Sequence, residues 1–420
     1  MTHFEDLIYT LNWILDTELS DNGTADTGAS KLVWHLDVLE SDDFGAELQA
    51  LPEKFVVRIY RPVWPRLDAF CICGIDWEAK ARKPRSKAFN YSKAEWETLI
   101  QLTQDKSEWS SIEAKVQSLE QNSTCKKRVL VPLSVYAANG MKVHTAAACY
   151  GIFWLLCHEG THAWKQHHKL QEIDFRELIQ NSSPLLAGAE LERTCEAEAD
   201  WQSTKFVFSS VLNCVVAGYN TALAYAAGFG TAAAILMLNP SRHNVWAQAE
   251  HHDPGWMRLH LVQGAAKAGG WSITEAYYPE YVAMVRQHGA GGVMRNNSNK
   301  NGPSSRFFER SRKTLEAFSL GLHHAMRYAQ ALSDANELHH IADRQHFKFG
   351  DPDEWKAFQI MVMETDVLKR RERARNELRR RLPPDPRFRG FALGYDALLR
   401  MSFLAAKKRA PIPGRVKSRR

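Results

Sequence analysis

The chain has 420 residues, 45% of them hydrophobic and 24% charged, and a formal net charge of +6 at pH 7. A chain of this length and apolar content can bury a sizeable core, which excludes a disordered protein and suggests two or three subdomains. Its seven cysteines are odd in number and scattered, which favours a reducing compartment over a disulfide scaffold.

Residues 1–135 are expected to form an α+β region. The N-terminus lacks the basic and apolar segments of a secretory signal, and apolar residues at helical spacing predict a helix at 3–17. Segments rich in β-branched and aromatic residues predict strands at 33–39, 55–60, 69–75 and 129–135, with a helix at 92–104. The stretch 128–134 leads directly into the next helix, so we expect it to be the edge strand of a substrate cleft.

The most informative motif is His158-Glu159-Gly160-Thr161-His162, on a helix expected at 141–166. Two histidines four residues apart place their imidazoles on one helix face, where they can bind zinc, and Glu159 can take a proton from a metal-bound water. The alternative is a pair of core histidines beside a buried glutamate. Three ionisable groups within one turn of an apolar helix are costly unless something compensates them, so the motif favours a metal.

A catalytic zinc needs a third protein ligand and an open position for water. The helix predicted at 191–201 carries Glu196 and Asp200 four residues apart on one face. One carboxylate can therefore bind the metal while the other fixes the tautomer of a ligating histidine. Taken alone, a glutamate-rich helix is more simply a solvated face.

His-Glu-x-x-His followed by Glu-x-Glu-Ala-Asp resembles the gluzincin metallopeptidases, especially their Ste24 and Oma-type branch. The resemblance implies a zincin-like, predominantly helical core in which Glu196 is the third zinc ligand. That branch also carries a later His-Pro-x-x-x-x-Arg-like element, which His252 and Arg258 match in spacing, although Asp253 departs from the usual Pro. By that pattern His252 and Arg258 help to bind the substrate backbone or stabilise the oxyanion. The alternative is an ordinary loop histidine and a surface arginine.

A narrower resemblance is to the Lit-type phage-exclusion peptidases of bacteria, which carry a further histidine five residues after the second zinc ligand. His167 has that spacing, whereas Gln166 stands where a glycine is expected. This resemblance implies a cytoplasmic bacterial enzyme that a lid or a protein partner activates or inhibits. Both resemblances together cover about residues 140–265.

Residues 206–241 contain no charged side chain and are long enough to span a membrane. Polar residues dilute the segment, three glycines interrupt it, and its alanine-rich part at 222–234 is typical of a close-packed pair of helices. We therefore favour buried helices. Association with an inner membrane is the alternative, because the Ste24-like relatives are membrane proteins.

After Arg258 we expect a helix at 259–288, a flexible loop or lid at 289–305 and a largely helical region at 306–382. Histidines at 323, 324, 339, 340 and 346 are interpreted as surface and helix-end residues and not as a second metal site. Basic runs at 369–375, 379–381, 407–409 and 415–420 attract anions such as nucleic acid weakly, or are simply solvated.

The sequence thus predicts four regions: 1–135, a zincin-like catalytic core at 136–288, the loop 289–305, and a helical region with a basic tail at 306–420. The predicted function is that of a zinc-dependent endopeptidase that acts on a protein or peptide substrate. Two alternatives stay open: a membrane-associated quality-control protease of the Ste24 or Oma type, and a non-catalytic basic binding protein with a structural zinc.

Overall fold

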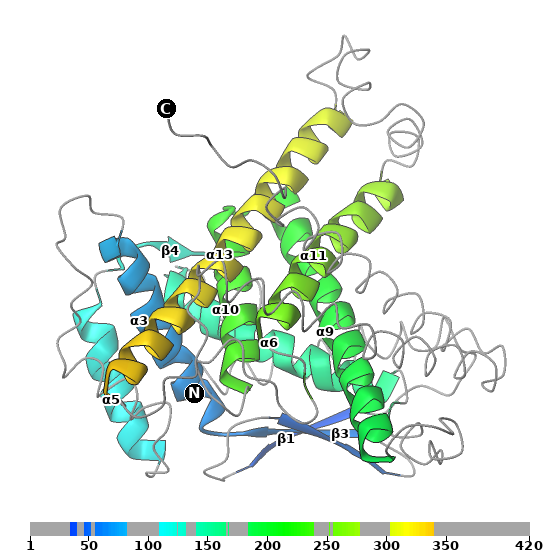
Figure 1. The fold of residues 1–420 in the computed structure, drawn as a ribbon. Coiled ribbons are helices and arrows are strands. Elements are labelled where there is room, and N and C mark those ends of the chain that lie inside the picture. Colours follow the sequence, from blue (N-terminus) through cyan, green and yellow to red (C-terminus); the bar gives the residue numbers. More distant parts are fainter. Residues whose placement is uncertain are drawn as a thin grey trace, which may run out of the picture.

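The computed structural model describes residues 34–39, 46–51, 55–81, 109–123, 125–131, 140–164, 167, 184–238, 252, 255–277 and 303–339. This part of the chain is α+β: it is mostly helical, with a small mixed sheet near its N-terminus (Figure 1). The helices predicted at 3–17 and 92–104, most of the loop at 289–305 and all of the basic runs of the tail lie outside the described residues.

The sheet lies at one end of the molecule, below the helices in Figure 1. Its strands are β1 (Trp34–Leu39), β2 (Ala46–Ala50) and β3 (Phe55–Tyr60), in the order β1-β3-β2. β3 runs parallel to β1 and antiparallel to β2. Alternate side chains such as Leu36, Val57 and Ile59 are buried against the helices, because successive residues of a strand point to opposite faces. β1 and β3 were predicted, whereas β2 was not.

The strand predicted at 69–75 is wrong, because these residues belong to helix α3 (Val63–Ala81). A short apolar run does not distinguish a strand from a helix that is buried on several sides. Here Ala69, Phe70, Cys71 and Ile72 are all buried, so helical periodicity is hidden. Helix α5 (Trp109–Asn122) packs against α3.

Of the predicted cleft strand, the structure describes residues 128–131, in which Arg128–Val129 form β4 and pair with β5 (Met141–Lys142), whereas residues 132–135 lie outside the described residues. β5 leads into α6 (Val143–Trp164), which carries the His-Glu-x-x-His motif. The first turns of α6 lie beside β4 and β5, whereas His158 lies fifteen residues further along, or roughly 22 Å at 1.5 Å per residue. β4 is therefore at the wrong end of α6 to line a cleft at the motif.

The predicted pair of close-packed helices is confirmed as α9 (Pro184–Val216) and α10 (Ala222–Leu238). The turn between them is a Schellman motif: Tyr219 N–H donates to the Cys214 carbonyl and Gly218 N–H to the Val215 carbonyl. Gly218 has a φ of 110°, which only glycine adopts without strain. Asn220 Oδ1 then caps α10 by accepting from the Ala222 N–H at 2.8 Å.

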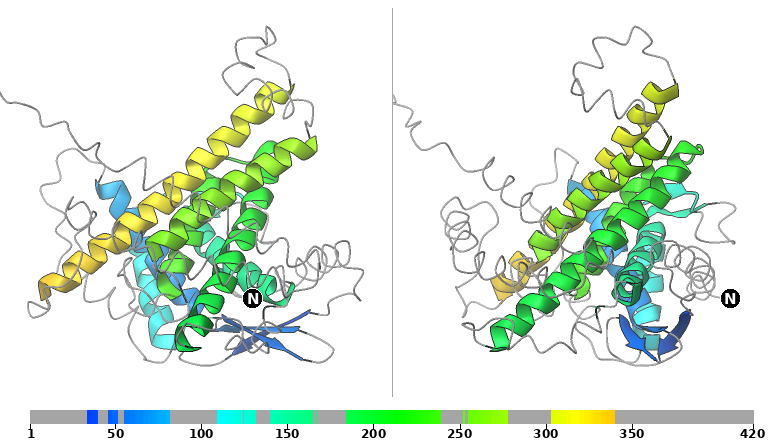
Figure 2. Two further views of the ribbon diagram at one scale, coloured as in Figure 1. Left: turned by 45° about the vertical axis from the view of Figure 1, so that its right-hand side comes forward. Right: turned by 90° about the vertical axis from the view of Figure 1, so that its right-hand side faces the viewer.

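Two long helices complete the described fold, α11 (Gly255–Tyr277) and α13 (Pro303–His339). They lie side by side in both views of Figure 2, and α11 also packs on α9. α10 is enclosed between α6 and α13 at the centre of the core. α13 includes residues 303–305, which were predicted as loop. Within the described part of the chain, no helix combines the length and apolar character needed to cross a membrane.

Candidate metal centre

The site is built between α6 and α9, which pack against each other as antiparallel helices. Three successive contacts between the two helices are each one helical turn apart on both helices. Trp154 Nε1–H donates to Thr204 Oγ1 at 2.9 Å, His158 Nδ1 lies 3.0 Å from Asp200 Oδ1, and His162 Nε2 lies 3.4 Å from Glu196 Oε1. Residues four apart share one helix face, so this register brings both motifs together.

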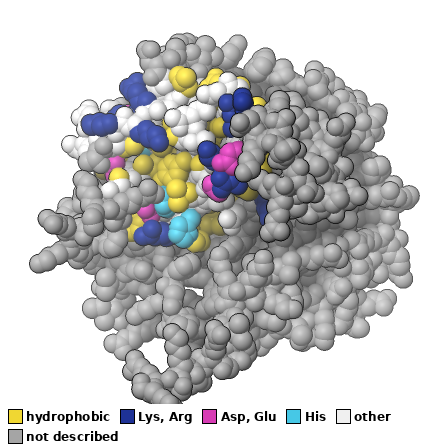
Figure 3. Space-filling model, turned by 90° about the horizontal axis from the view of Figure 1, so that it is seen from above, with side chains coloured by type: hydrophobic (Ala, Val, Ile, Leu, Met, Phe, Trp, Pro, Cys, Tyr) yellow, Lys and Arg dark blue, Asp and Glu magenta, His cyan; other side chains and the backbone are white. Residues whose placement is uncertain are grey.

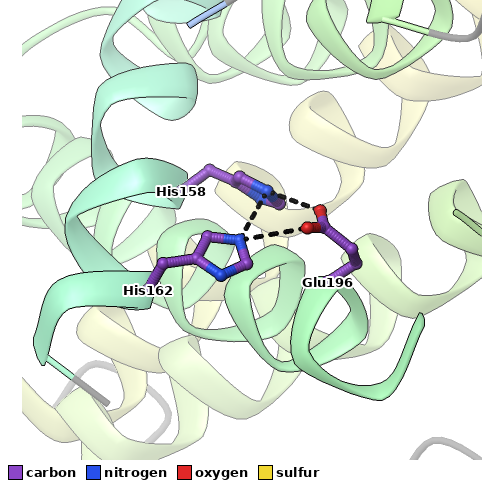
Figure 4. A group of neighbouring side chains, drawn as sticks. All are labelled: His158, His162 and Glu196. Carbon is purple, nitrogen blue, oxygen red and sulfur yellow. Dashed lines mark hydrogen bonds and ion pairs between the residues drawn. The ribbon is translucent and has the colours of Figure 1, made fainter. Parts of the chain in front are cut away.

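The two histidines and Glu196 converge on one point (Figure 4). His158 Nε2 lies 2.9 Å from Glu196 Oε2 and 3.2 Å from His162 Nε2, and one ligand atom from each of the three residues lies within 4.8 Å of the others. Donors bound tetrahedrally to zinc at 2.0–2.1 Å stand about 3.3 Å apart, so this spacing fits a single ion. Among the described residues, His, Cys, Asp and Glu side chains come together at this spacing in this group.

The electrostatics of the site couple the charge of His158 to that of its neighbouring carboxylates. Burial alone would lower the pKa of His158, but the carboxylates of Asp200 and Glu196 outweigh burial and raise that pKa to about 10. Burial alone would raise the pKa of Glu196, but the neighbouring His162 and His158 hold it well below its usual value. These contacts therefore stabilise a positively charged ring at His158 and an ionised carboxylate at Glu196.

Glu159 is half-buried on α6, next to the first histidine. Burial raises the pKa of its carboxyl group, and the positive charge of His158 and His162 only partly offsets this effect. Glu47 of β2 also raises the pKa of Glu159, so β2 lies within electrostatic range of this carboxylate. β2 is an edge strand that packs on α6, so among the described strands it is β2 and not β4 that lies near the motif.

The two residues of the later motif have different positions. His252 Nε2 lies 3.0 Å from Glu196 Oε2, and its side chain is 29% exposed, so this histidine reaches the centre. Arg258 is not a surface residue: it is 3% exposed and donates to both oxygens of Asp200, from Nε at 2.7 Å and from Nη2 at 2.8 Å. The guanidinium of Arg258 therefore contacts the Asp200 carboxylate, which in turn contacts His158, and does not belong to the group formed by the two histidines and Glu196.

Two residues at the centre have roles that sequence reasoning missed. His167 is buried just beyond α6, with Nδ1 2.9 Å from His162 Nδ1 and Nε2 3.4 Å from Glu198 Oε2. Burial lowers the pKa of His167 to about 4, so its ring is neutral at pH 7. The sequence marked His167 by its spacing alone, and Glu198 is two residues from Glu196, on another face of α9.

The interpretation of the later histidines is partly wrong. His324 of α13 is buried, not at the surface, where its Nδ1 lies 3.1 Å from Tyr225 Oη and its Nε2 lies 3.6 Å from Glu78 Oε2. His323 is exposed, whereas residues 340 and 346 lie outside the described residues.

Comparisons with known protein families, with curated proteins and with solved structures returned no match for this chain. The function of this protein is therefore inferred from the geometry of the centre and from the chemistry of its residues.

Proposed function

We propose that this protein is a zinc-dependent endopeptidase of the gluzincin type, with a zincin-like core. The observation that carries the proposal is the meeting of His158 and His162 with Glu196 at the spacing of a tetrahedral site. Two imidazoles and one carboxylate are a donor set typical of catalytic zinc, which keeps a further position open for water or substrate. The partial exposure of Glu196 and His162 supports access to that position.

The chain's own residues supply the proton transfers and the binding. When bound, zinc supplies Lewis-acid chemistry, polarising a carbonyl group and acidifying water. Glu159 takes the proton of the attacking water at its carboxylate and passes it to the leaving amine nitrogen. Its raised pKa makes it a stronger base than an exposed glutamate. His252 is placed to donate to the developing oxyanion, and Asp200 holds His158 in the tautomer that keeps Nε2 free for the metal.

A peptide substrate is supported by the position of β2. This strand pairs with β3 on one side and, among the described residues, with no strand on the other. An extended peptide can add to such an edge through backbone hydrogen bonds. Because β2 packs on α6 and Glu47 lies within electrostatic range of Glu159, a peptide on this edge would pass close to the general base.

The decisive experiment separates metal binding from catalysis. Zinc content by elemental analysis and hydrolysis of a fluorogenic peptide library are measured for the wild type, Glu159→Gln, His162→Ala and Glu196→Gln. We expect about one zinc per wild-type chain and little in the two ligand variants. Glu159→Gln should keep its zinc and lose about 10²–10⁴-fold in kcat/KM, because only the general base is removed. Glu120→Gln is the matched control, at a partly exposed glutamate of α5 whose carboxylate pairs with Lys142 of β5, far from the centre.

Two results would overturn the proposal. A wild-type protein without zinc would remove the metal centre, and unchanged hydrolysis by Glu159→Gln would remove the assigned general base. Either result would favour the alternative of a non-catalytic binding protein.

A structural zinc site is the second candidate, favoured by the contact of His252 with Glu196. If His252 were a fourth ligand, the coordination shell would be closed and the zinc would not be catalytic. The His158, His162 and Glu196 donor atoms form the compact group without His252, which favours the open site. His252→Ala distinguishes the two: an open site keeps its zinc and loses activity, whereas a closed site loses zinc.

The basic-binding alternative depends on the basic runs at 369–420, which lie outside the described residues, so it stays a prediction from the sequence. On the described part of the face drawn in Figure 3, Lys and Arg side chains lie around a hydrophobic patch together with Asp, Glu and His. The role in phage exclusion and its protein trigger stay predictions from the sequence resemblance.

A further inference from the structure

The two ligating histidines present the same atom to the metal position but have different partners behind them. Their Nε2 atoms lie 3.2 Å apart and both face Glu196. Behind His158, Nδ1 meets the carboxylate of Asp200 directly. Behind His162, Nδ1 meets another imidazole, that of His167, at 2.9 Å.

The positions of the ring protons on His162 and His167 follow from hydrogen-bond chemistry. A neutral imidazole that binds a metal through Nε2 carries its proton on Nδ1. The two facing Nδ1 atoms of His162 and His167 can share only one proton, so His167 Nδ1 must accept it. The proton of His167 is then on Nε2, which faces Glu198 Oε2 at 3.4 Å. Every ring nitrogen in the chain from metal to carboxylate thereby has a partner.

We propose that His167 and Glu198 act as a positioning relay for His162, with His167 fixing the tautomer and ring orientation of this ligand and Glu198 fixing those of His167. This inference rests on the proposed metal site. In most such sites a carboxylate, a carbonyl or a water contacts the ligating histidine directly. Here a second imidazole stands between the ligand and the carboxylate, so the negative charge of Glu198 is held one ring further from the ion.

The burial of the pair supports a dedicated role. His167 is 3% exposed and Glu198 is 5% exposed, and a buried carboxylate is costly unless hydrogen bonds compensate it. The rings of His162 and His167 meet edge to face, with centroids 4.9 Å apart and an interplanar angle of 80°. His167 contacts the nitrogen of His162 that faces away from the metal position, which favours a positioning role over a role as a further ligand.

The test measures zinc affinity by competition with a chelator, together with the absorption spectrum of the cobalt(II)-substituted protein. His167→Leu removes both hydrogen bonds of the relay while keeping a buried side chain, and we expect zinc affinity to fall about 10–100-fold with a changed cobalt spectrum. His167→Gln should restore most of the affinity, because its amide oxygen can accept from His162 while its NH₂ donates to Glu198.

His144→Leu is the matched control, since this histidine is also buried on α6 but lies near Met141 and Asp68, at the other end of the helix. It should leave zinc affinity and the cobalt spectrum unchanged even if it lowers stability. If His167→Leu does not fold, Glu198→Gln carries the test, because it removes the charge of the relay while preserving its shape. We expect Glu198→Gln to weaken zinc binding severalfold.

The inference is overturned if zinc affinity and the cobalt spectrum of His167→Leu match the wild type, or if the Gln and Leu variants weaken binding equally. Unchanged affinity in Glu198→Gln overturns the part assigned to the carboxylate. None of these results bears on the proposed metal centre, which is overturned only if the wild type binds no zinc.

Discussion

Asp200 is completely buried, and its carboxylate is shared between a histidine of α6 and an arginine of α11. Burial would raise its pKa, but the guanidinium of Arg258 and the contact with His158 hold that pKa below the usual value. Asp200 therefore stays ionised behind His158 throughout the neutral range. Arg258 stabilises this charge in a bidentate pair, which explains why an arginine is buried so close to the candidate metal centre.

Arg258→Leu should consequently act through Asp200. Removing the guanidinium leaves a buried carboxylate without its main partner, so we expect the free energy of unfolding to fall by about 3–5 kcal/mol, measured by urea denaturation at neutral pH. The double variant Asp200→Leu, Arg258→Leu should lose less than the sum of the single variants, because it leaves no unpaired charge. A loss below about 1 kcal/mol in Arg258→Leu would show that Arg258 is not the partner on which Asp200 depends.

The parts of the site that could be predicted from the sequence are those set by a single helix. His158 and His162 share a face because they are four residues apart, and the same spacing relates Glu196 to Asp200. The position of Arg258 depends on how α11 packs against α9, which no local spacing determines. For that reason the sequence suggested an oxyanion role for Arg258, whereas its contacts favour a positioning role.

At the scale of elements, α10 sets how closely the central helices approach. Gly228 lies against the backbone of Phe318 in α13, and Gly230 lies against the backbone of Ala147 in α6. A Cβ atom at either glycine would overlap a carbonyl oxygen of the facing helix. Because α6 carries His158 and His162 of the candidate metal centre, its contact with α10 also sets the position along α9 that these histidines face.

Gly230→Ala should therefore be strongly destabilising. The new methyl group cannot be accommodated by rotating a side chain, because its neighbours are backbone atoms of Ala147 and Gly151. We expect a loss of about 3 kcal/mol or more in thermal or urea unfolding, together with weaker zinc binding. Gly269→Ala is the control, since a Cβ there would lie 3.1 Å from Lys205 O and should cost much less. If the two variants are equally stable, α10 does not approach the backbone of α6 as closely as described.

Some elements of the fold could be predicted because their signals are local, and others could not. The turn of α9 into α10 is encoded by Gly218 and Asn220, which the sequence showed only as a glycine and a polar residue within the apolar run. β2 has few β-branched residues and owes its conformation to pairing with β3. The reverse error occurred in α3, where uniform burial removed the periodicity that identifies a helix.

At the scale of the whole molecule, one hydrophobic core runs from the sheet through α6 and α10 to α13. Tyr150 lies within it, fully buried on α6, and its hydroxyl has no hydrogen-bond partner among the described residues. Burial raises the pKa of this phenol well above 10, and neighbouring groups such as Cys214 raise it further. The folded protein therefore holds Tyr150 neutral at a pH where the unfolded chain releases the proton.

This difference gives a pH dependence with a definite sign. The stability contributed by neutral Tyr150 is fully present below the unfolded pKa of about 10 and is lost as the pH rises toward the folded pKa, by up to about 1.4 kcal/mol per pH unit. Tyr150→Phe removes the ionisable hydroxyl together with its unsatisfied hydrogen-bonding capacity. We expect the variant to be more stable than the wild type by about 1 kcal/mol at pH 8, and by more at pH 11, in urea unfolding.

Tyr60→Phe provides the control, because the hydroxyl of Tyr60, a half-buried residue at the end of β3, donates to Glu47 Oε2 at 3.1 Å. Loss of that hydrogen bond should lower stability slightly at pH 8, by about 0.5–1.5 kcal/mol. If Tyr150→Phe instead loses stability at pH 8, the hydroxyl must have a partner in the folded protein. Above pH 10 the wild type should still lose stability relative to Tyr150→Phe, because a buried phenol that donates a hydrogen bond also resists ionisation.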